Sequence, residues 1–212
     1  MPVLASSAQL LAFPGPGIGV RAALLAQLKL HRLPEHLIEA FIREAVSLPV
    51  RSIDEALSEV LAARMLPAAI DPDKRIFLIG PSGAGVTSVA EKLRHHAGLS
   101  DRTILVESQS FHPRNMRART AFGCASQRPD VETIGVVSAL ADAEEISEII
   151  SAFRLSRIIV TGLDMARRFG ALAAAVTQGA RLVHVTRSPK PDAKLETLSA
   201  RELAAMLCAD QI

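Results

Sequence analysis

A glycine-rich turn between an apolar segment and an amphipathic segment constrains this chain more than any other feature. Residues 75–79 (Arg-Ile-Phe-Leu-Ile) form a short apolar run that predicts a buried strand. Gly80, Gly83 and Gly85 follow and permit a sharp turn, and residues 87–95 have helical spacing. Strand, glycine turn and helix in this order begin a βα unit, so the chain should contain a sheet whose strands alternate with helices.

The rest of the chain extends this alternation and adds a helical segment before it. The sequence predicts strands at 103–106, 134–137, 157–161 and 181–185, and helices at 143–153, 170–177 and 201–207. Before about residue 65 only helical patterns occur, among them a capping box that starts at Ser52. A proline-containing run at 71–74 marks a boundary. We therefore predict a helical bundle in 1–70 and an α/β domain with a mainly parallel sheet in 71–212.

The glycine turn matches the phosphate-binding loop of P-loop proteins in all but one place. That pattern is Gly, four residues, Gly, Lys, and Ser or Thr. Gly80, Gly85 and Thr87 are in register, whereas Val86 stands at the lysine position. Backbone N–H groups of such a loop favour an anion, and Thr87 could ligate a metal ion. The alternatives are a purely structural turn and helix capping by Thr87 and Ser88.

Segments from about Ile76 to Leu207 resemble, in order, the signal-recognition-particle (SRP) family of GTPases. Residues 87–93 (Thr-Ser-Val-Ala-Glu-Lys-Leu) resemble the family's Thr-Thr-Thr-x-x-Lys-Leu helix start. Residues 161–164 (Thr-Gly-Leu-Asp) look like its guanine-reading Thr-Lys-x-Asp motif, and 168–172, 182–186 and 191–196 resemble the segments that follow. The resemblance implies a P-loop NTPase-type α/β domain, shortened here, joined to an N-terminal helical domain.

The same resemblance implies where a nucleotide would bind. GTP or GDP with Mg²⁺ is the candidate ligand, although no cofactor is expected to be required. Asp164 would accept hydrogen bonds from guanine, the alternative being a helix N-cap. Thr87 is the candidate metal ligand. The candidate binding residues are Gly80, Ser82, Gly83, Ala84, Gly85, Val86, Thr87, Ser88 and Asp164.

Departures from the family pattern argue against hydrolysis. Phosphoryl transfer needs cations positioned around the γ-phosphate. Lys74 or Lys92 could replace the missing lysine, but Lys92 should face the core side of its helix. No Asp in the chain is followed by Gly three residues later, and the segment between Pro129 and Ala139 is too short, so a strand and its switch loop are predicted to be deleted. The other replaced positions are Gln109, His112, Gly162 and Ser188-Pro189.

These features predict a degenerate member of the family with no catalytic residues. We expect a cytoplasmic bacterial protein that does not hydrolyse GTP and acts through protein–protein interaction in flagellar assembly or placement, or in membrane targeting. The expected partner is another SRP-type GTPase, a flagellar component or a second copy, with peripheral membrane contact as an addition. The short bundle and the early end of the chain favour the flagellar-placement branch. The alternative is a GTP-binding switch or slow GTPase with substituted site residues.

Composition excludes several other classes of protein. A net charge of +2 and the absence of Trp and Tyr argue against a nucleic-acid partner. Cys124 and Cys208 are far apart and predict reduced thiols. No segment predicts a signal peptide or a membrane span. Residues 111–119 carry three arginines and no acid, which predicts either a solvated helix face or a face for an anionic partner.

Overall fold

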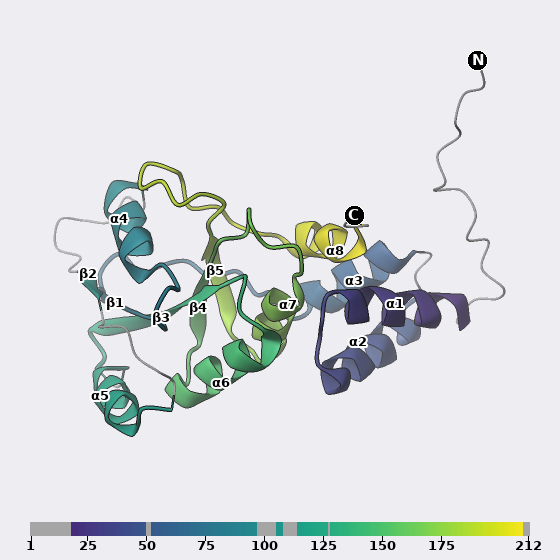
Figure 1. Cartoon of the computed structure of the whole chain (residues 1–212), viewed down its shortest axis with the longest axis horizontal. Helices are drawn as coiled ribbons and strands as arrows, with labels where there is room; N and C mark the ends of the chain where they lie inside the picture. Colours follow the sequence, from purple (N-terminus) through teal and green to yellow (C-terminus); the bar gives the residue numbers. More distant parts are fainter. Residues whose placement is uncertain (1–17, 50–51, 97–104, 108–113, 127, 210–212) are drawn as a thin grey trace, which may run out of the picture.

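The structure is a computed structural model and describes residues 18–49, 52–96, 105–107, 114–126 and 128–209 (Figure 1). A helical part comes first, and strands alternate with helices after it, so the predicted fold class is confirmed. In chain order the elements are α1 (Ile18–Leu30), α2 (Glu35–Ser47), α3 (Ile53–Ala62), β1 (Arg75–Ile79), α4 (Val86–His96), β2 (Leu105–Glu107), α5 (Met116–Ser126), β3 (Val131–Ser138), α6 (Ala143–Phe153), β4 (Arg157–Thr161), α7 (Gly170–Thr177), β5 (Arg181–Val185) and α8 (Ala200–Cys208).

The five strands form one parallel sheet in the order β2-β1-β3-β4-β5. β3 begins three residues before the predicted start, because Val131 pairs with Arg75 at the first position of β1. β2 is bonded directly to β1, and α5 is the only described element between β2 and β3 along the chain. The described chain between Pro129 and Ala139 forms β3, and the deletion of a strand and its switch loop relative to the family stays a prediction.

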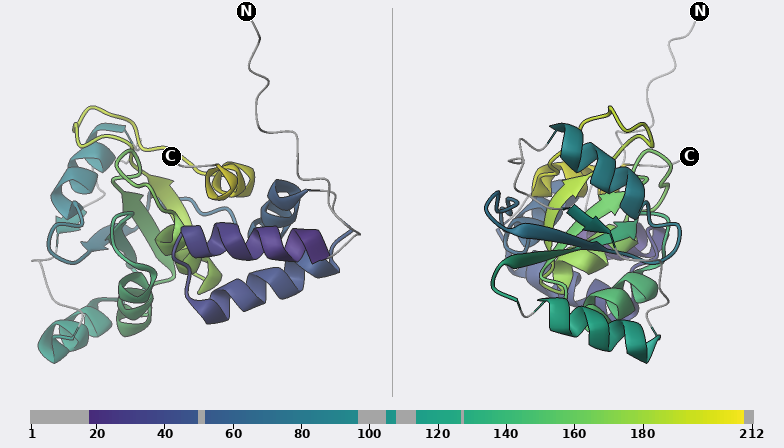
Figure 2. Two further views of the ribbon diagram at one scale, coloured as in Figure 1. Left: turned by 45° about the vertical axis from the view of Figure 1, so that its right-hand side comes forward. Right: turned by 90° about the vertical axis from the view of Figure 1, so that its left-hand side faces the viewer.

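Alternating side chains of the strands supply two apolar faces, one above and one below the sheet. Ile76 and Leu78 point to the face that α4 covers, where they join Val89 and Leu93 of that helix. Helices α6 and α7 cover the opposite face (Figure 2). Because both faces are buried, the strands contain nearly continuous runs of apolar residues, as is typical of parallel sheets.

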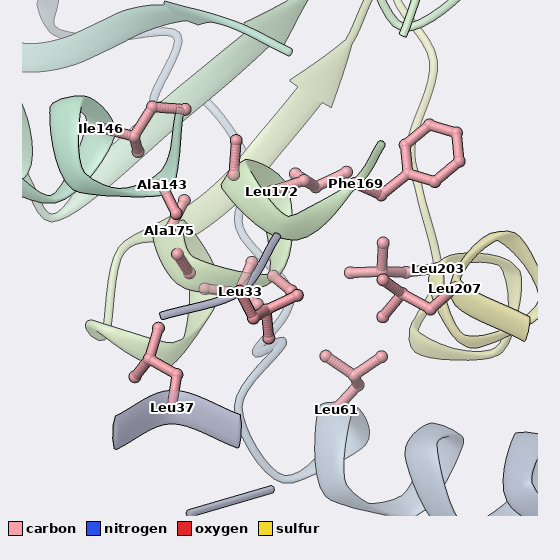
Figure 3. Packing of buried hydrophobic residues seen from close by; sticks show 14 of the residues in the cluster. Leu33, Leu37, Leu61, Ala143, Ile146, Phe169, Leu172, Ala175, Leu203 and Leu207 are labelled. Carbon is pink, nitrogen blue, oxygen red and sulfur yellow. The ribbon is translucent and has the colours of Figure 1, made fainter. Parts of the chain in front are cut away.

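The N-terminal helices pack against the last helix of the chain as well as against each other. Leu61 of α3 lies close to Leu203 and Leu207 of α8, and all three side chains are fully buried (Figure 3). The same buried cluster continues through Phe169 and Leu172 to the lower face of the sheet. The helices α1–α3 therefore share a core with a segment that the sequence assigns to 71–212, and the division at residue 70 stays a prediction.

The turn between α1 and α2 holds the bundle to the start of α7. The backbone N–H of Phe169 donates to Nδ1 of His31 at 3.1 Å, and the two rings are 5.5 Å apart. A side chain at Gly170 would bring its Cβ to 2.1 Å from the carbonyl oxygen of His31, so only glycine permits this approach. Burial lowers the pKa of His31. The backbone carbonyl of Leu207 raises this pKa and the charge of Arg168 lowers it, each by less than burial does. A neutral imidazole is the form in which Nδ1 can accept.

A second connection fixes the chain that leads from the bundle into the sheet. Glu132 on β3 is buried and forms an ion pair with Arg157 on β4. The other carboxylate oxygen accepts from the backbone N–H of Asp71 at 2.9 Å, and the Arg157 guanidinium also donates to the carbonyl of Ala69 at 2.5 Å. The pair therefore ties residues 69–71 to the amino-terminal edge of the sheet.

No helix among the described residues is both long and apolar enough to cross a membrane.

Candidate functional site

The glycine turn lies at the carboxyl end of β1, where open parallel sheets bind ligands. Gly83 and Gly85 have φ angles of 81° and 85°, which residues other than glycine rarely adopt. Gly80 has no room for a side chain, because its Cβ would lie 2.5 Å from the carbonyl oxygen of Val136. Glycine is therefore required at three points of the turn by conformation or by space.

The backbone of this turn can receive an anion. The N–H groups of Gly83, Gly85, Val86 and Thr87 donate to no acceptor within the part of the chain that the structure describes. Ser82, Gly83 and Thr87 are exposed. A loop with free N–H groups before a helix N-terminus attracts negative charge. The backbone of the turn therefore has the chemistry to attract an anion, and phosphate binding there stays a prediction.

Val86, which stands at the lysine position, belongs to the apolar packing under the turn. Its side chain packs on the buried cluster that includes Ile76, Val136 and Ala90. Its Cγ2 would lie 2.9 Å from a Cβ at Gly80, so the valine lies against the first glycine of the loop. At the position where a P-loop lysine would supply a cation, Val86 therefore supplies an apolar side chain that packs on this cluster.

Thr161, the first residue of the Thr-Gly-Leu-Asp segment, holds the glycine turn in place. Its hydroxyl donates to the carbonyl of Ala84 at 2.7 Å and lies 3.3 Å from that of Val137. Its methyl group lies 3.4 Å from where a Cβ of Gly85 would be. The sequence assigned this segment to guanine recognition and gave no signal for the contact, since a threonine at a strand end has many potential acceptors.

Lys92 does not reach the glycine turn. The side chain is 1% exposed, as its predicted position on the core side of α4 requires. Its ammonium group donates to the carbonyl of Lys190 and, at 3.3 Å, to that of Ala193. Ser88 donates to the carbonyl of Pro189 at 3.3 Å. Lys92 and Ser88 of α4 therefore hold the loop that follows β5, and Lys92 cannot replace the phosphate lysine while it does so.

Replacing Lys92 by methionine should release this loop. The change leaves the carbonyls of Lys190 and Ala193, the acceptors of two part-buried hydrogen bonds, without their donor, and an acceptor left unsatisfied by burial costs about 1–3 kcal/mol. We therefore expect the free energy of unfolding, measured with urea, to fall by about 1–3 kcal/mol. Lys194→Met is the matched control, because Lys194 is exposed on the same loop and should change stability by less than about 0.5 kcal/mol. Equal stabilities of the two variants would contradict the assigned role of Lys92.

Asp164 lies in an exposed turn beyond β4 and does not cap a helix. The N-cap residue of α7 is Phe169, so the capping alternative for Asp164 is wrong. The turn is held by the N–H of Leu163, which donates to the carbonyl of Thr186 at 3.0 Å. The Asp164 carboxylate has no hydrogen-bond partner in the described chain, and whether it reads a guanine stays a prediction.

The other positions at which the sequence departs from the SRP-family pattern lie in different parts of the structure. Gln109 and His112 lie outside the described residues. Gly162 has a φ angle of 69°, which accounts for glycine at the position of the base-reading lysine. Thr87 is exposed in the first turn of α4, and within the described residues no group of three or more His, Cys, Asp or Glu side chains could hold a metal ion.

The arginines of 111–119 lie on and beside α5, which is on the opposite side of the sheet from α4 (Figure 1). Arg114, Arg117 and Arg119 are exposed, which agrees with a solvated helix face. Arg114 forms an ion pair of 3.0 Å with Glu148 on α6, so the fold supplies an acid that the segment itself lacks.

Comparison with known proteins identifies the fold. No protein-family model matches the chain, and no curated protein matches its sequence. The structure of FlhF complexed with GMPPNP/Mg(2+) matches with a TM-score of 0.72 and 16% identity over 92% of this chain and 100% of that one. FtsY from Thermotoga maritima gives 0.64 and 14% over 90% and 88%, and chloroplast FtsY from Physcomitrella patens gives 0.63 and 15% over 88% and 87%. The chain thus has the fold of SRP-type GTPases, as the sequence resemblance implied.

Proposed function

We propose that this chain is a non-hydrolysing protein with the SRP-type GTPase fold, and that it acts by binding other proteins. The observation that carries this proposal is how the glycine turn is held. Val86 packs beneath it, Thr161 bonds to its backbone, and Lys92 is engaged with another loop. The turn is stabilised by the protein itself and needs no nucleotide to order it.

The residues of the turn suit a phosphate but not phosphoryl transfer. The free N–H groups could cradle an anion, and Thr87 could contribute a hydroxyl. Transfer requires cations that stabilise charge on the γ-phosphate, and the described side chains of the turn include no lysine or arginine. A bound GTP would therefore lack the groups that accelerate its hydrolysis.

Flagellar placement is the process that we propose to test first, with membrane targeting as the other. The sequence resemblance is to a family that includes a flagellar-placement branch, and the comparison with FlhF gives a TM-score of 0.72. The partner would be an SRP-type GTPase, a flagellar component or a second copy of this chain, at a cytoplasmic location. Flagellar genes beside the gene for this chain would support the first process.

A GTP-binding switch is the second candidate function. It is favoured by the free N–H groups of the turn, by the exposed Asp164, and by the fact that the similar FlhF structure contains GMPPNP/Mg(2+). Calorimetric titration with GTP and with GDP, each with Mg²⁺, separates the candidates. We expect no guanine-specific binding in the micromolar range, and such binding would overturn the interaction-only function.

Restoring the lysine should not restore hydrolysis. We expect the Val86→Lys variant to release phosphate from GTP no faster than the wild type, because the other cationic and metal-binding groups are also replaced. Val86→Met is the control, since it keeps an apolar side chain over Gly80 without adding charge. Phosphate release under multiple-turnover conditions is the measurement. Turnover by Val86→Lys but not by Val86→Met would show that the rest of the site is still catalytic.

A further inference from the structure

A cleft of about 720 Å³ lies between the bundle and the chain segments that follow β3 and β4. Three segments form it: the α1–α2 turn, the chain from β3 into α6, and the chain from β4 into α7. A volume in this range suits a small ligand or a few side chains of a partner. The residues that line the cleft include His31, Arg32, Leu140, Met165, Arg167 and Arg168.

Two large apolar side chains stand exposed at the rim of this cleft. Leu140 is 57% exposed and Met165 is 61% exposed, and they come from different segments. Exposed apolar side chains that are grouped around a hollow mark binding surfaces more often than isolated ones do. Methionine is also enriched in protein–protein interfaces. The rim therefore offers an anchoring point for an apolar side chain of a partner.

Three arginines line the same cleft without an acidic partner. Arg32, Arg167 and Arg168 form no ion pair with any residue in the described ranges. Two carboxylates also line the cleft. Asp142 is occupied as the N-cap of α6, where it accepts from the N–H of Glu145 at 2.7 Å, and Glu144 is exposed in the first turn of the same helix, so the three arginines still outnumber the acids. Unpaired guanidinium groups around a hollow recognise carboxylates and other anions through paired hydrogen bonds.

Arg32 stands where the backbone favours glycine. Its φ angle is 57°, and it ends α1 in the position where helices usually place a glycine. The N–H of Leu33 donates to the carbonyl of Leu28 at 3.1 Å, which completes this helix end. A side chain in this conformation costs on the order of 1 kcal/mol relative to glycine. The Arg32 side chain is exposed in this position and lines the cleft.

The wall of the cleft is fixed rather than adjustable. His31 is 1% exposed and holds the start of α7 through the N–H of Phe169. Gly170 lies directly against the same turn. The arginines at positions 32, 167 and 168 are therefore carried by two segments that are held together, and a partner would meet them already arranged.

We propose that this cleft binds an acidic segment of a partner protein, with its carboxylates on Arg32, Arg167 and Arg168 and an apolar side chain against Leu140 and Met165. The proposal deepens the proposed function and rests on it, since it names the surface and the chemistry of the protein partner. It differs from binding at the glycine turn, because none of the cleft residues belongs to that turn.

Selection from a random 12-residue peptide library displayed on phage tests this, with the full-length chain as the target. We expect the enriched peptides to combine Asp or Glu with Leu, Ile or Phe. A synthetic copy should bind the Arg167→Glu/Arg168→Glu variant at least about tenfold more weakly, because reversed charges repel the segment. Arg117→Glu/Arg119→Glu makes the same charge change on α5 and should leave binding unchanged. Circular dichroism checks that both variants are folded.

A second pair of variants separates binding from stability. Arg32→Gly and Arg154→Gly each replace an arginine of positive φ at a helix end, so both should raise the Tm by about 2–4 °C. Only Arg32→Gly should weaken the binding of the peptide, by at least about threefold, since Arg154 lies outside the cleft.

The outcomes distinguish this inference from the proposed function. The proposal that the cleft binds an acidic segment would be overturned by any of three results. These are a selection that enriches no peptides, enriched peptides without an acidic bias, and equal binding by Arg167→Glu/Arg168→Glu and the wild type. Displacement of the peptide by inorganic phosphate or GTP at equal concentration would assign the cleft to a small anion and would overturn it as well. GTP hydrolysis by the wild type would overturn the proposed function but would leave the peptide binding measurable.

Discussion

Gly170→Ala should lower the free energy of unfolding by about 3 kcal/mol, near the upper end for an overpacked site. The added Cβ would lie 2.1 Å from the carbonyl oxygen of His31 and 3.0 Å from its carbonyl carbon. These are backbone atoms, so relief requires the α1–α2 turn to move away from α7. That movement would also break the bond from the Phe169 N–H to His31. Urea unfolding followed by circular dichroism measures the change.

Gly123→Ala is the matched control for this substitution. Gly123 lies within α5, and outside the helix's own backbone no atom of the described residues comes within 4 Å of an added Cβ. Alanine is the better helix former, so this variant should be as stable as the wild type or more stable by up to about 1 kcal/mol. A Gly170→Ala variant within about 0.5 kcal/mol of the wild type would show that the bundle and the sheet are less tightly joined than the structure indicates.

Arg157→Met should cost about 3 kcal/mol, the lower end of the range for breaking a buried ion pair. Glu132 has a side chain that is 7% exposed, and without Arg157 its one remaining partner among the described residues is the N–H of Asp71. The Arg157 side chain is 27% exposed, which places the cost toward the lower end. The carbonyl of Ala69 also loses its donor. The midpoint of urea unfolding is the measurement.

A double-mutant cycle identifies the source of that cost. The Glu132→Leu/Arg157→Met variant contains no unpaired charge at this site and should be more stable than Arg157→Met alone. Arg128→Met is the exposed control, because the pair of Arg128 with Asp130 is about half exposed on both sides and should contribute less than about 1 kcal/mol. If the double variant were the least stable of the set, the pair would act through packing rather than through charge.

Two substitutions near the glycine turn have a structural role where the sequence resemblance would lead us to expect a nucleotide-binding residue. Val86 packs on the apolar cluster next to Gly80, and Gly162 adopts a positive φ. Lys92, which matches the family pattern, secures the loop after β5. This pattern supports a scaffold maintained for its shape, which is the condition that the proposed function requires.

Most of the secondary structure could be predicted from the sequence, because strand and helix patterns depend on neighbouring residues. The strands at 75–79, 157–161 and 181–185 and the helices at 143–153 and 170–177 are confirmed. The sequence places the start of β3 too late, since Glu132 interrupts the apolar run and its pairing with Arg157 is what explains a charge there. The sequence predicts the helix α5 only as one alternative for the arginine segment, because its glycine and mixed polar residues give little periodicity.

The sequence by itself determined the order of strands and helices, the glycine turn and the missing lysine, because these depend on local pattern and residue identity. The tertiary structure decided what the polar side chains do. Thr161 bonds to a residue 77 positions away, Lys92 to one 98 positions away, and His31 to one 138 positions away. It also placed α8 on the N-terminal bundle and gathered three arginines from two segments into one cleft. No local pattern encodes such pairings, since they follow from how the packed layers bring distant segments together.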